Sequence, residues 1–584
     1  MPRRPELQPL PALRALPSRW DLLAFPLLFS VLFLLAWGSR GMHVPYAVDA
    51  APAISLQPQA LPEYALRTTL RMAAALLCSF VFTCVFAKLA AASRRAEQVL
   101  IPLLDVLQSV PILGFLSVTV VWFIKLFPGN LLGAECAAIF AIFTSQAWNM
   151  AFSFFYSLRM VPKDLYQVAD LFGLSPWQRF CKLELPFAAP NLVWNAMMSV
   201  SGGWFFVVAS EAITVGGHSV LLPGVGSYIA VAIQREDLHA IGWAIVCMAL
   251  LIALYDQLVF RPLVAWADKF RFEFSQAQPT PASWMLTLLT RARWLRALLA
   301  VPLLALATGG HWLAQRLPRR RWRPVPRIKW RRVAPLGDWS GLLFNLGVAL
   351  AAVVVTVLLA RFVLREASYA EIARVFGLGA CTLLRVLVLS LLATLLWVPL
   401  GILIGLHPRL AARSQPLALF LSAFPANLLF PVAVLGIVHF RLNPEIWVSP
   451  LMILGTQWYI LFNVVAGASA LPNDLREAAA NLGLRGWPLW RRVLLPAVFP
   501  AYLTGGLTAS GGAWNASVVS EVVSWGPTTL TATGVGAYIA QQTAVGDTPR
   551  VVLGIAVMSL YVVVCNRFLW KRLYGWAQNR LALD

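Results

Sequence analysis

The sequence predicts an all-α membrane protein with about twelve transmembrane helices in two homologous six-helix halves. Its composition, its apolar runs and an internal repeat support this prediction. Hydrophobic residues make up 59% of the 584 residues and charged residues 12%, whereas soluble domains contain about 45–50% and about 25%. A water-soluble chain of this size would need more polar surface to cover its core. The composition therefore excludes disordered, fibrous and disulfide-rich secreted proteins.

Twelve apolar runs approach or reach the length of about 20 residues that a membrane span requires. They lie at residues 22–37, 65–90, 98–124, 133–158, 187–213 and 240–266, and at 342–362, 378–405, 412–438, 446–469, 497–522 and 550–572. We expect every run to be helical, because lipid tolerates only helices or closed barrels and these runs are too long for barrel strands. Four arginines precede the first run and no convincing cleavage site follows it. This pattern predicts an uncleaved first span and a cytoplasmic N-terminus.

The two sets of six runs form an internal repeat. From Pro162 to about Trp266 the first half aligns without gaps to the second at a constant offset, which is 521 − 211 = 310 for the pair Glu211 and Glu521. Other identical pairs are Asp164/Asp474, Gly173/Gly483, Trp177/Trp487, Pro186/Pro496, Trp204/Trp514, Ser210/Ser520, Gly224/Gly534, Gly226/Gly536 and Tyr228/Tyr538. Two equivalent bundles with equal numbers of spans predict parallel repeats with a pathway between them.

A basic segment separates the halves. We expect a first half at residues 1–273, a linker at 274–340 and a second half at 341–584. Residues 274–337 contain twelve basic residues and no Asp or Glu, so the positive-inside rule places the linker in the cytoplasm and explains the net charge of +22 without nucleic acid. We expect its apolar piece, Trp294 to Thr308, to be an interfacial helix or a re-entrant hairpin.

One segment occurs twice, after the fourth span of each half, and predicts two short helices joined by a turn. In the second copy Asp474 is expected to cap the first helix, with Glu477 closing a capping box. Asp164 and Gln167 repeat that arrangement in the first copy. Gly173 and Gly483 fall where a helix would end in a left-handed residue.

The helix of the second copy carries three small residues. Ala478, Ala479 and Ala480 leave one face of low profile, and such a face can press into a groove on a partner. The alternative is an ordinary loop helix on the membrane surface. Duplication and cytoplasmic placement favour a loop that transmits force from a soluble partner.

These residues carry a family resemblance. Glu477-Ala478-Ala479, followed by Gly483 and Leu495-Pro496, resembles the EAA loop of ABC importer permeases, and Gln167-Val168-Ala169 with Gly173 is a degenerate version. Downstream, residues 520–524 and 533–539 resemble the nitrate/sulfonate/taurine-type permeases, which include bicarbonate carriers. The resemblance covers almost all of both halves, so one chain resembles two permease subunits joined by a linker.

The resemblance implies a type I ABC importer permease fold in a bacterial inner membrane, with both termini cytoplasmic. It implies that the duplicated loops dock onto two cytoplasmic ABC ATPase subunits, which would bind ATP and Mg, and that a periplasmic or extracellular solute-binding protein delivers the solute. The implied ATPase-coupling residues are Asp164, Gln167, Ala169, Gly173, Asp474, Glu477, Ala478, Ala479 and Gly483. The degenerate first loop leaves open whether the two loops contribute equally.

Candidate pathway residues cluster in the fifth span of each half. They are Ser201, Trp204, Ser210, Glu211, Ser510, Trp514, Asn515, Ser520 and Glu521. Mid-membrane carboxylates usually face a cavity or a partner, so Glu211 and Glu521 either lie at the outer mouth of the pathway or anchor the turn that follows. The remaining residues either line the pathway or serve helix packing. The segments after each glutamate predict a turn and a short helix at the outer face.

The chain itself is not expected to be an enzyme. It has no GxxxxGK[ST] phosphate loop, no nucleophile–base motif and no metal-ligand spacing among its seven cysteines. The sequence therefore predicts an ATP-driven permease subunit, without its own cofactor or metal, that imports a small polar or anionic solute by alternating access. An ion- or proton-coupled secondary transporter and an ATPase-driven exporter remain the alternatives.

Overall fold

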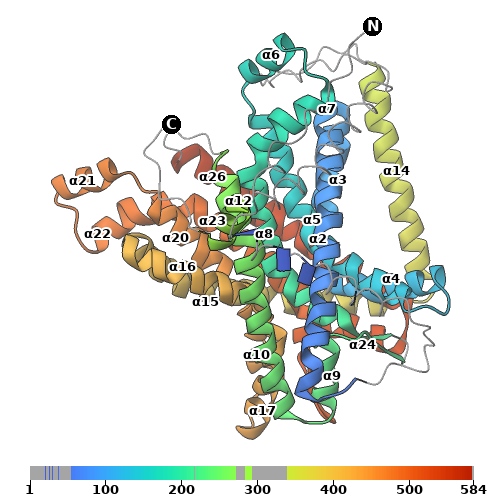
Figure 1. The fold of residues 1–584 in the computed structure, drawn as a ribbon. Coiled ribbons are helices and arrows are strands. Elements are labelled where there is room, and N and C mark those ends of the chain that lie inside the picture. Colours follow the sequence, from blue (N-terminus) through green and yellow to red (C-terminus); the bar gives the residue numbers. More distant parts are fainter. Residues whose placement is uncertain are drawn as a thin grey trace.

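The computed structural model describes residues 54–215, 218–270, 283–292 and 339–581, together with isolated residues between 20 and 37. These residues are mostly helical, and two short two-stranded sheets join the helices at one end. Figure 1 shows long helices packed side by side, with the helical loops α6 and α21–α22 projecting from the packed body. The all-α fold is therefore confirmed.

The first half contains ten α-helices among the described residues of 54–270. They are α2 (Leu61–Ala92), α3 (Arg94–Gln108), α4 (Ile112–Leu126), α5 (Leu132–Met160), α6 (Lys163–Leu171), α7 (Pro176–Arg179), α8 (Leu185–Glu211), α9 (Val225–Gln234), α10 (Leu238–Tyr255) and α11 (Arg261–Asp268). Shorter turns are η3 (Pro58–Ala60), η4 (Phe180–Glu184) and η5 (Asp256–Phe260), and α12 (Trp284–Arg291) follows within the expected linker.

The second half repeats this order. Its helices are α14 (Trp339–Leu364), α15 (Tyr369–Gly405), α16 (Pro408–Ala423), α17 (Phe430–His439), α18 (Pro444–Trp447), α19 (Leu451–Leu454), α20 (Trp458–Ser469), α21 (Asn473–Asn481), α22 (Trp487–Leu489), α23 (Leu495–Ser520), α24 (Val535–Val545), α25 (Thr548–Cys565) and α26 (Lys571–Leu581). Shorter turns are η6 (Ala426–Leu429), η7 (Trp490–Leu494) and η8 (Asn566–Trp570).

The membrane spans follow the predicted runs. Among the described residues eight helices are long and apolar enough to cross a membrane, and three bent helix pairs raise the number to eleven. These eleven correspond to the predicted runs from 65–90 onward. The predicted first span at 22–37 and the apolar linker piece from Trp294 to Thr308 lie almost entirely outside the described residues.

Three of the runs expected as single spans are broken, and the mildest break bends run 446–469 by 46° between α19 and α20. Run 98–124 bends by 88° between α3 and α4, and run 412–438 bends by 77° between α16 and the helices that follow it. Pro111 and Pro425 lie at the two sharper breaks. Proline lacks an N–H and disfavours helical geometry in the residue before it, so each of these two breaks has a local cause.

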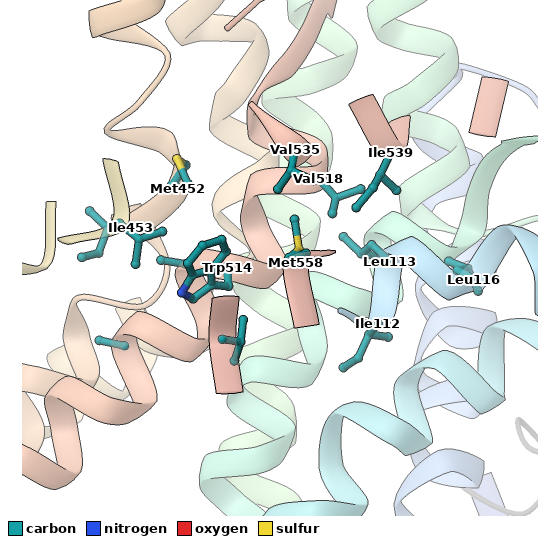
Figure 2. Close-up of a cluster of buried hydrophobic side chains, with 14 of the residues drawn as sticks. Ile112, Leu113, Leu116, Met452, Ile453, Trp514, Val518, Val535, Ile539 and Met558 are labelled. Carbon is teal, nitrogen blue, oxygen red and sulfur yellow. The ribbon is translucent and has the colours of Figure 1, made fainter. Parts of the chain in front are cut away.

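Each half inserts its broken span into the other half. Ile112, Leu113 and Leu116 of α4 pack in one buried cluster with α23 and α24 of the second half, and Figure 2 shows them beside Ile539 and Met558. Conversely, η6 and α17 of the second half pack in a cluster with α8 of the first half. In lipid, such close packing is what holds helices together, so the halves form one interdigitated body.

Two β-hairpins follow the fifth spans and were not predicted. The strands β1 (Ala212–Val215) and β2 (His218–Leu221) pair antiparallel, as do β3 (Val522–Trp525) and β4 (Thr528–Thr531). The second hairpin has a two-residue turn, and glycine occupies its position 526 with φ of 55°. β-branched residues around such a turn favour a hairpin. The hairpins connect the fifth spans to α9 and α24.

Candidate functional site

The duplicated helical loops end as the sequence predicts. Gly173 has φ of 63° and Gly483 has φ of 69°. Leu174 N donates to Ala169 O, 3.1 Å away, and Gly173 N donates to Asp170 O at 3.0 Å, which is the Schellman pattern of a helix end. The second loop repeats both hydrogen bonds. The predicted left-handed glycines are therefore confirmed.

The predicted caps of these helices are wrong. The residue before each helix is a proline, Pro162 or Pro472, and no side chain caps either N-terminus. Asp164 and Asp474 lie instead in the first helical turn, where a carboxylate complements the positive end of the helix. The expected box with Gln167 or Glu477 is consequently not formed, because each helix starts two residues earlier than predicted.

The next helix of the first loop, α7, does have a side-chain cap. Ser175 Oγ accepts a hydrogen bond from Gln178 N and the Gln178 side chain returns to the Ser175 backbone, with Pro176 at the first helical position. In the second loop the residue before α22 is Gly486, which has φ of 57° and no side chain to cap the helix. Ser175 itself corresponds to Arg485 at the offset of 310. The two loops thus differ at this helix start.

The coupling candidates divide into an exposed set and a buried set. Asp164, Gln167, Gly173, Asp474, Glu477, Ala478 and Gly483 are exposed. Ala169 and Ala479 are buried. The alanine face predicted for a partner is therefore split, because Ala479 packs inward while Ala478 and Ala480 face outward.

Polar contacts brace the first loop against its own half. Tyr166 Oη donates to Glu184 Oε1 at 3.4 Å, and Lys88 Nζ donates to the same carboxylate at 2.6 Å. Asp170 of α6 pairs with Arg179 of α7. Burial and the Glu184 carboxylate raise the pKa of the Tyr166 phenol, so it remains a hydrogen-bond donor.

The second loop has no counterpart to this brace. At the offset of 310, Glu184 corresponds to Leu494 and Tyr166 to Arg476. Asp170 and Arg179 correspond to Ala480 and Leu489. The equivalent positions therefore cannot form the same ion pairs, and the two loops have the same backbone with different support.

The glutamates at the ends of the fifth spans are buried anchors of α9 and α24, the helices that follow the hairpins. Glu211 Oε2 accepts from Gly226 N at 2.7 Å, and its Oε1 accepts from Thr68 Oγ1 at 2.7 Å. A Cβ on Gly224 would overlap the Glu211 carboxylate, so only glycine permits this approach. Glu211 therefore anchors the turn that follows the fifth span, which the sequence analysis gave as the alternative to a place at the mouth of the pathway.

A buried arginine accompanies Glu211. Arg71 Nη1 donates to Glu211 Oε1 at 2.6 Å, and its Nε and Nη2 donate to Glu135 at 2.5 and 2.7 Å. The side chains of all three residues are fully buried. Arg71 Nη2 also donates to Pro223 O at 2.9 Å. The first ion triad, Arg71–Glu135–Glu211, therefore ties α2, α5, α8 and the turn before α9 together.

The second half repeats the triad in a more open form. Thr382 Oγ1 donates to Glu521 Oε1 at 2.8 Å, and Arg385 Nη1 lies 3.3 Å from the same oxygen. Arg385 also pairs with Glu445, whose side chain is 43% exposed. We name Arg385–Glu445–Glu521 the second ion triad. Water can reach one of its carboxylates, whereas the first triad is closed.

Sequence reasoning missed four members of these triads, namely Arg71, Glu135, Arg385 and Glu445. Glu135 and Glu445 keep the offset of 310, but the arginines differ by 385 − 71 = 314. An alignment begun at Pro162 therefore could not pair them. A search for ionisable residues within the second span of each half would have found both.

The other predicted pathway residues lie in the fifth spans with different surroundings. The hydroxyls of Ser201, Ser210 and Ser510 each donate to a carbonyl of their own helix. Ser520 is buried, as are Trp204 and Trp514, which pack on Tyr255 and Tyr561 of their own halves. These contacts place the two tryptophans in helix packing.

Asn515 differs from these residues because it faces the other half. Its Oδ1 accepts from Ile112 N, the first amide of α4, at 2.8 Å. Asn427 of η6 lies at the related contact, where its Nδ2 is 3.5 Å from Phe205 O of α8. The boundary between the halves therefore carries neutral amide groups at both helix breaks.

Nothing in the described ranges has the composition of a metal centre. No group of three or more His, Cys, Asp or Glu side chains there could hold a metal ion. The charged groups of the site are the two triads, and each arginine is matched by two carboxylates. Their chemistry is that of fixed ion pairs.

Comparison with known proteins identifies transport permeases that are similar to this chain. The chain is 28% identical to the nitrate import permease protein NrtB of Leptolyngbya laminosa over 205 residues, which is 35% of this chain and 68% of that protein. It is 28% identical to the bicarbonate transport system permease protein CmpB of Synechococcus elongatus over 191 residues, covering 32% and 63%. It is 30% identical to the glycine betaine/proline betaine transport system permease protein ProW of Escherichia coli (strain K12) over 206 residues, covering 34% and 54%.

The chain thus spans about half to two thirds of the lengths of these relatives. Residues 79–261 and 397–569 each match the family described as "Binding-protein-dependent transport system inner membrane component". Each match contains one helical loop and one buried glutamate at the end of the fifth span. Because the two matches together cover more than half of the chain, the protein belongs to this family of ABC transporter permeases, with one copy of the family domain in each half.

Proposed function

We propose that this chain supplies both membrane halves of an ATP-driven importer for a small polar or anionic solute. The observation that carries the proposal is the pair of exposed helical loops, one in each family domain. Their tips present apolar side chains to the surroundings: Phe172 is 77% exposed and Leu482 is 76% exposed. An exposed apolar tip on a structured loop is typical of a protein-binding surface.

The proposed partners at these tips are two ABC ATPase subunits, which would bind ATP and Mg. Glu477 and Asp474 on the second loop, with Asp164 and Gln167 on the first, are exposed beside the tips and available to a partner. Ala169 and Ala479 would support them from below. The fifth span starts directly after each loop, so a push on the loop reaches the pathway through α8 or α23.

The proposed pathway runs between α8 and α23 and opens at the end opposite the loops. Asn515 on α23 faces the first half, and Thr508 and Thr504 lie about two and three turns closer to the loops on the same helix. Seven and eleven residues correspond to about two and three turns, so Gly511, Thr508 and Thr504 stay near one face with Asn515. The corresponding face of α8 carries Trp194, Met198 and Phe205. A polar wall opposite an apolar wall suits a small solute with hydrogen-bonding groups.

The names of the relatives support the class of solute. Nitrate, bicarbonate and betaine importers share small charged solutes, and a solute-binding protein on the outer side would select among them. The arginines of both triads are matched by carboxylates. Among the residues described here, neither triad arginine is therefore free to bind an anionic solute. This supports selection of the solute by a separate binding protein.

Co-purification tests the proposal. Phe172→Asp with Leu482→Asp places a charge on both apolar tips without touching the packed body, and Val545→Asp on α24, where the side chain is 76% exposed, is the matched control. We expect an ATPase to co-purify with the native chain and the control, and to be lost from the double variant. Mass spectrometry of the purified sample identifies the subunits.

Transport in proteoliposomes gives the second measurement. With the ATPase and a binding protein present, uptake of labelled nitrate, bicarbonate or betaine should require ATP and stop in the double variant. A chain that purifies alone and takes up solute on an ion gradient without ATP would contradict the proposal. That result would favour an ion-coupled secondary transporter, and ATP-driven efflux would favour an exporter.

A further inference from the structure

The two halves touch at the outer end through a hairpin and a helix end. Gly526, at the tip of β3–β4 in the second half, donates its N–H to Ile233 O of α9 in the first half at 3.0 Å. On the other side of the boundary β1 of the first half contacts α24 of the second half. Each hairpin therefore lies against the outer helix of the opposite half.

The helix end that receives Gly526 has an unusual residue. Glu236 follows α9 with φ of 55°, a left-handed conformation that non-glycine residues seldom adopt. Asp237 N donates to Ala232 O and Glu236 N donates to Ile233 O, so Glu236 occupies the glycine position of a Schellman helix end. In the second half the same position is Gly546, with φ of 83°. Strained residues of this kind often belong to functional contacts.

The Glu236 side chain lies against Gly526. A Cβ placed on Gly526 would come within 2.7 Å of Glu236 Cγ and would overlap the carboxylate. Gly526 itself has φ of 55°, so glycine is needed there both for the turn and for the approach of Glu236. The unusual residue in one half and the glycine in the other thus form one contact across the boundary.

We infer that Glu236 and Gly526 form an outer latch that holds the two halves together, and that Glu236 is a positioning residue for the opening of the outer end. The inference rests on the proposed function. A solute that enters from the outer side requires the halves to separate there. The hairpin follows α23 directly through Glu521, so a movement of α23 that starts at the second loop would lift Gly526 off α9.

A cysteine pair tests the latch. A Cβ on Gly526 would lie 2.7 Å from Glu236 Cγ, which is one bond from the Glu236 Cβ. Glu236→Cys with Gly526→Cys therefore places two Cβ atoms within reach of the separation of about 3.8 Å that a disulfide needs. We expect oxidation of the resting protein to form this disulfide, detected as a linked peptide by mass spectrometry. In the assembled transporter we expect solute uptake to fall at least tenfold on oxidation and to return on reduction, whereas the single-cysteine variants keep their uptake under oxidant.

Two outcomes would overturn the latch. One is failure of the disulfide to form in the resting protein, and the other is a fully cross-linked protein that still takes up solute at the native rate. Failure of the proposed function looks different: the native chain without cysteine changes would then not take up solute with ATP, whatever the state of the cross-link.

A second variant separates latching from local folding. Glu236→Gly keeps the helix end, as Gly546 does in the other half, but removes the side chain from Gly526. We expect it to fold normally, and we expect the transporter assembled with it to hydrolyse ATP several-fold faster without solute. Arg441→Gly is the matched control, because Arg441 also has a positive φ, 50°, at a helix end whose hydrogen bonds stay within the second half. Equal ATP hydrolysis in Glu236→Gly and native protein would contradict the positioning role.

Discussion

The two halves share one fold but differ in how their polar groups are supported. In the first half Arg71, Glu135 and Glu211 are fully buried and hydrogen-bonded on all sides. In the second half Arg385 is 14% exposed and Glu445 is 43% exposed. The helical loop differs in the same direction, since Glu184 braces the first loop and Leu494 replaces it in the second. The first half is thus the more tightly fixed of the two.

This difference bears on how a fused pair of halves can work. When two identical chains pair, symmetry gives them the same support, whereas a fused chain lets each half change by itself. Here the half with the degenerate loop motif, Gln167 in place of Glu477, has gained the closed triad and the braced loop. We interpret the first half as the more rigid of the two. In the second half, we expect the positions of the helical loop and of the ion triad to depend more on contacts with partner proteins.

The largest difference between the halves should appear when each arginine is removed. Arg71→Met leaves two carboxylates buried without a counter-charge, and breaking a buried ion pair in this way costs about 3–5 kcal/mol. Arg385→Met should cost about 1 kcal/mol, because water reaches Glu445 and exposed pairs contribute little. The measurement is the midpoint of thermal unfolding in detergent for both variants.

Equal losses of stability in Arg71→Met and Arg385→Met would contradict the proposed difference between the two ion triads. A double variant sharpens it: Arg71→Met with Glu135→Gln removes one buried charge together with the arginine. Glu211 then keeps its hydrogen bonds from Thr68 and Gly226. We expect this variant to recover part of the stability lost in Arg71→Met.

The fold could be predicted from the sequence further than the site could. Eleven runs and the loop glycines were found because apolar length and left-handed turns leave local signals. The hairpins and the helix breaks at Pro111 and Pro425 were missed, because each is short beside a long apolar run. Arg71 was missed for another reason, since its partners lie 64 and 140 residues away and no local pattern joins them.

The caps of the loop helices show the limit of a local rule. Asp474 and Glu477 have the spacing of a capping box, yet the helix begins at Asn473. Pro472 can precede a helix because its missing N–H is not needed there. Sequence spacing predicted the presence of the helix, and a shift of two residues at its start changed the role of the carboxylate.

The next largest effect concerns the boundary between the halves. Asn515→Leu leaves Ile112 N, the first amide of α4, without its acceptor, and a buried unpaired donor costs about 2 kcal/mol. Asn427→Leu should cost less than half of that, because its contact with Phe205 O is 3.5 Å long. Comparing the unfolding midpoints of the two variants tests the difference, and a larger loss for Asn427→Leu would contradict it.

A smaller effect is expected when the first loop is made to resemble the second. Glu184→Leu copies Leu494 and removes the acceptor of Lys88 and Tyr166, which should cost about 1.5 kcal/mol for hydrogen bonds to a charged group. Lys88→Ile with Glu184→Leu copies the apolar pair Ile402 and Leu494 and should restore most of the stability. Unfolding midpoints report the stability, and the ratio of solute uptake to ATP hydrolysis reports whether the unbraced loop still transmits force. An unchanged midpoint in Glu184→Leu would contradict the brace.

The smallest effect concerns the start of the second loop helix. Ser175→Ala removes the side-chain cap of α7, and losing an N-cap costs about 1 kcal/mol. Gly486→Ser places the same capping residue in the second loop, but φ is 57° there, and a non-glycine residue in that region is strained by about 1 kcal/mol. We therefore expect both changes to speed hydrogen exchange of the amides that follow, measured loop by loop. Slower exchange in Gly486→Ser would mean that α22 lacks a cap only because glycine has no side chain. Faster exchange would mean that the backbone at position 486 does not accept a capping residue. In that case exchanging residues could not make the two loops alike.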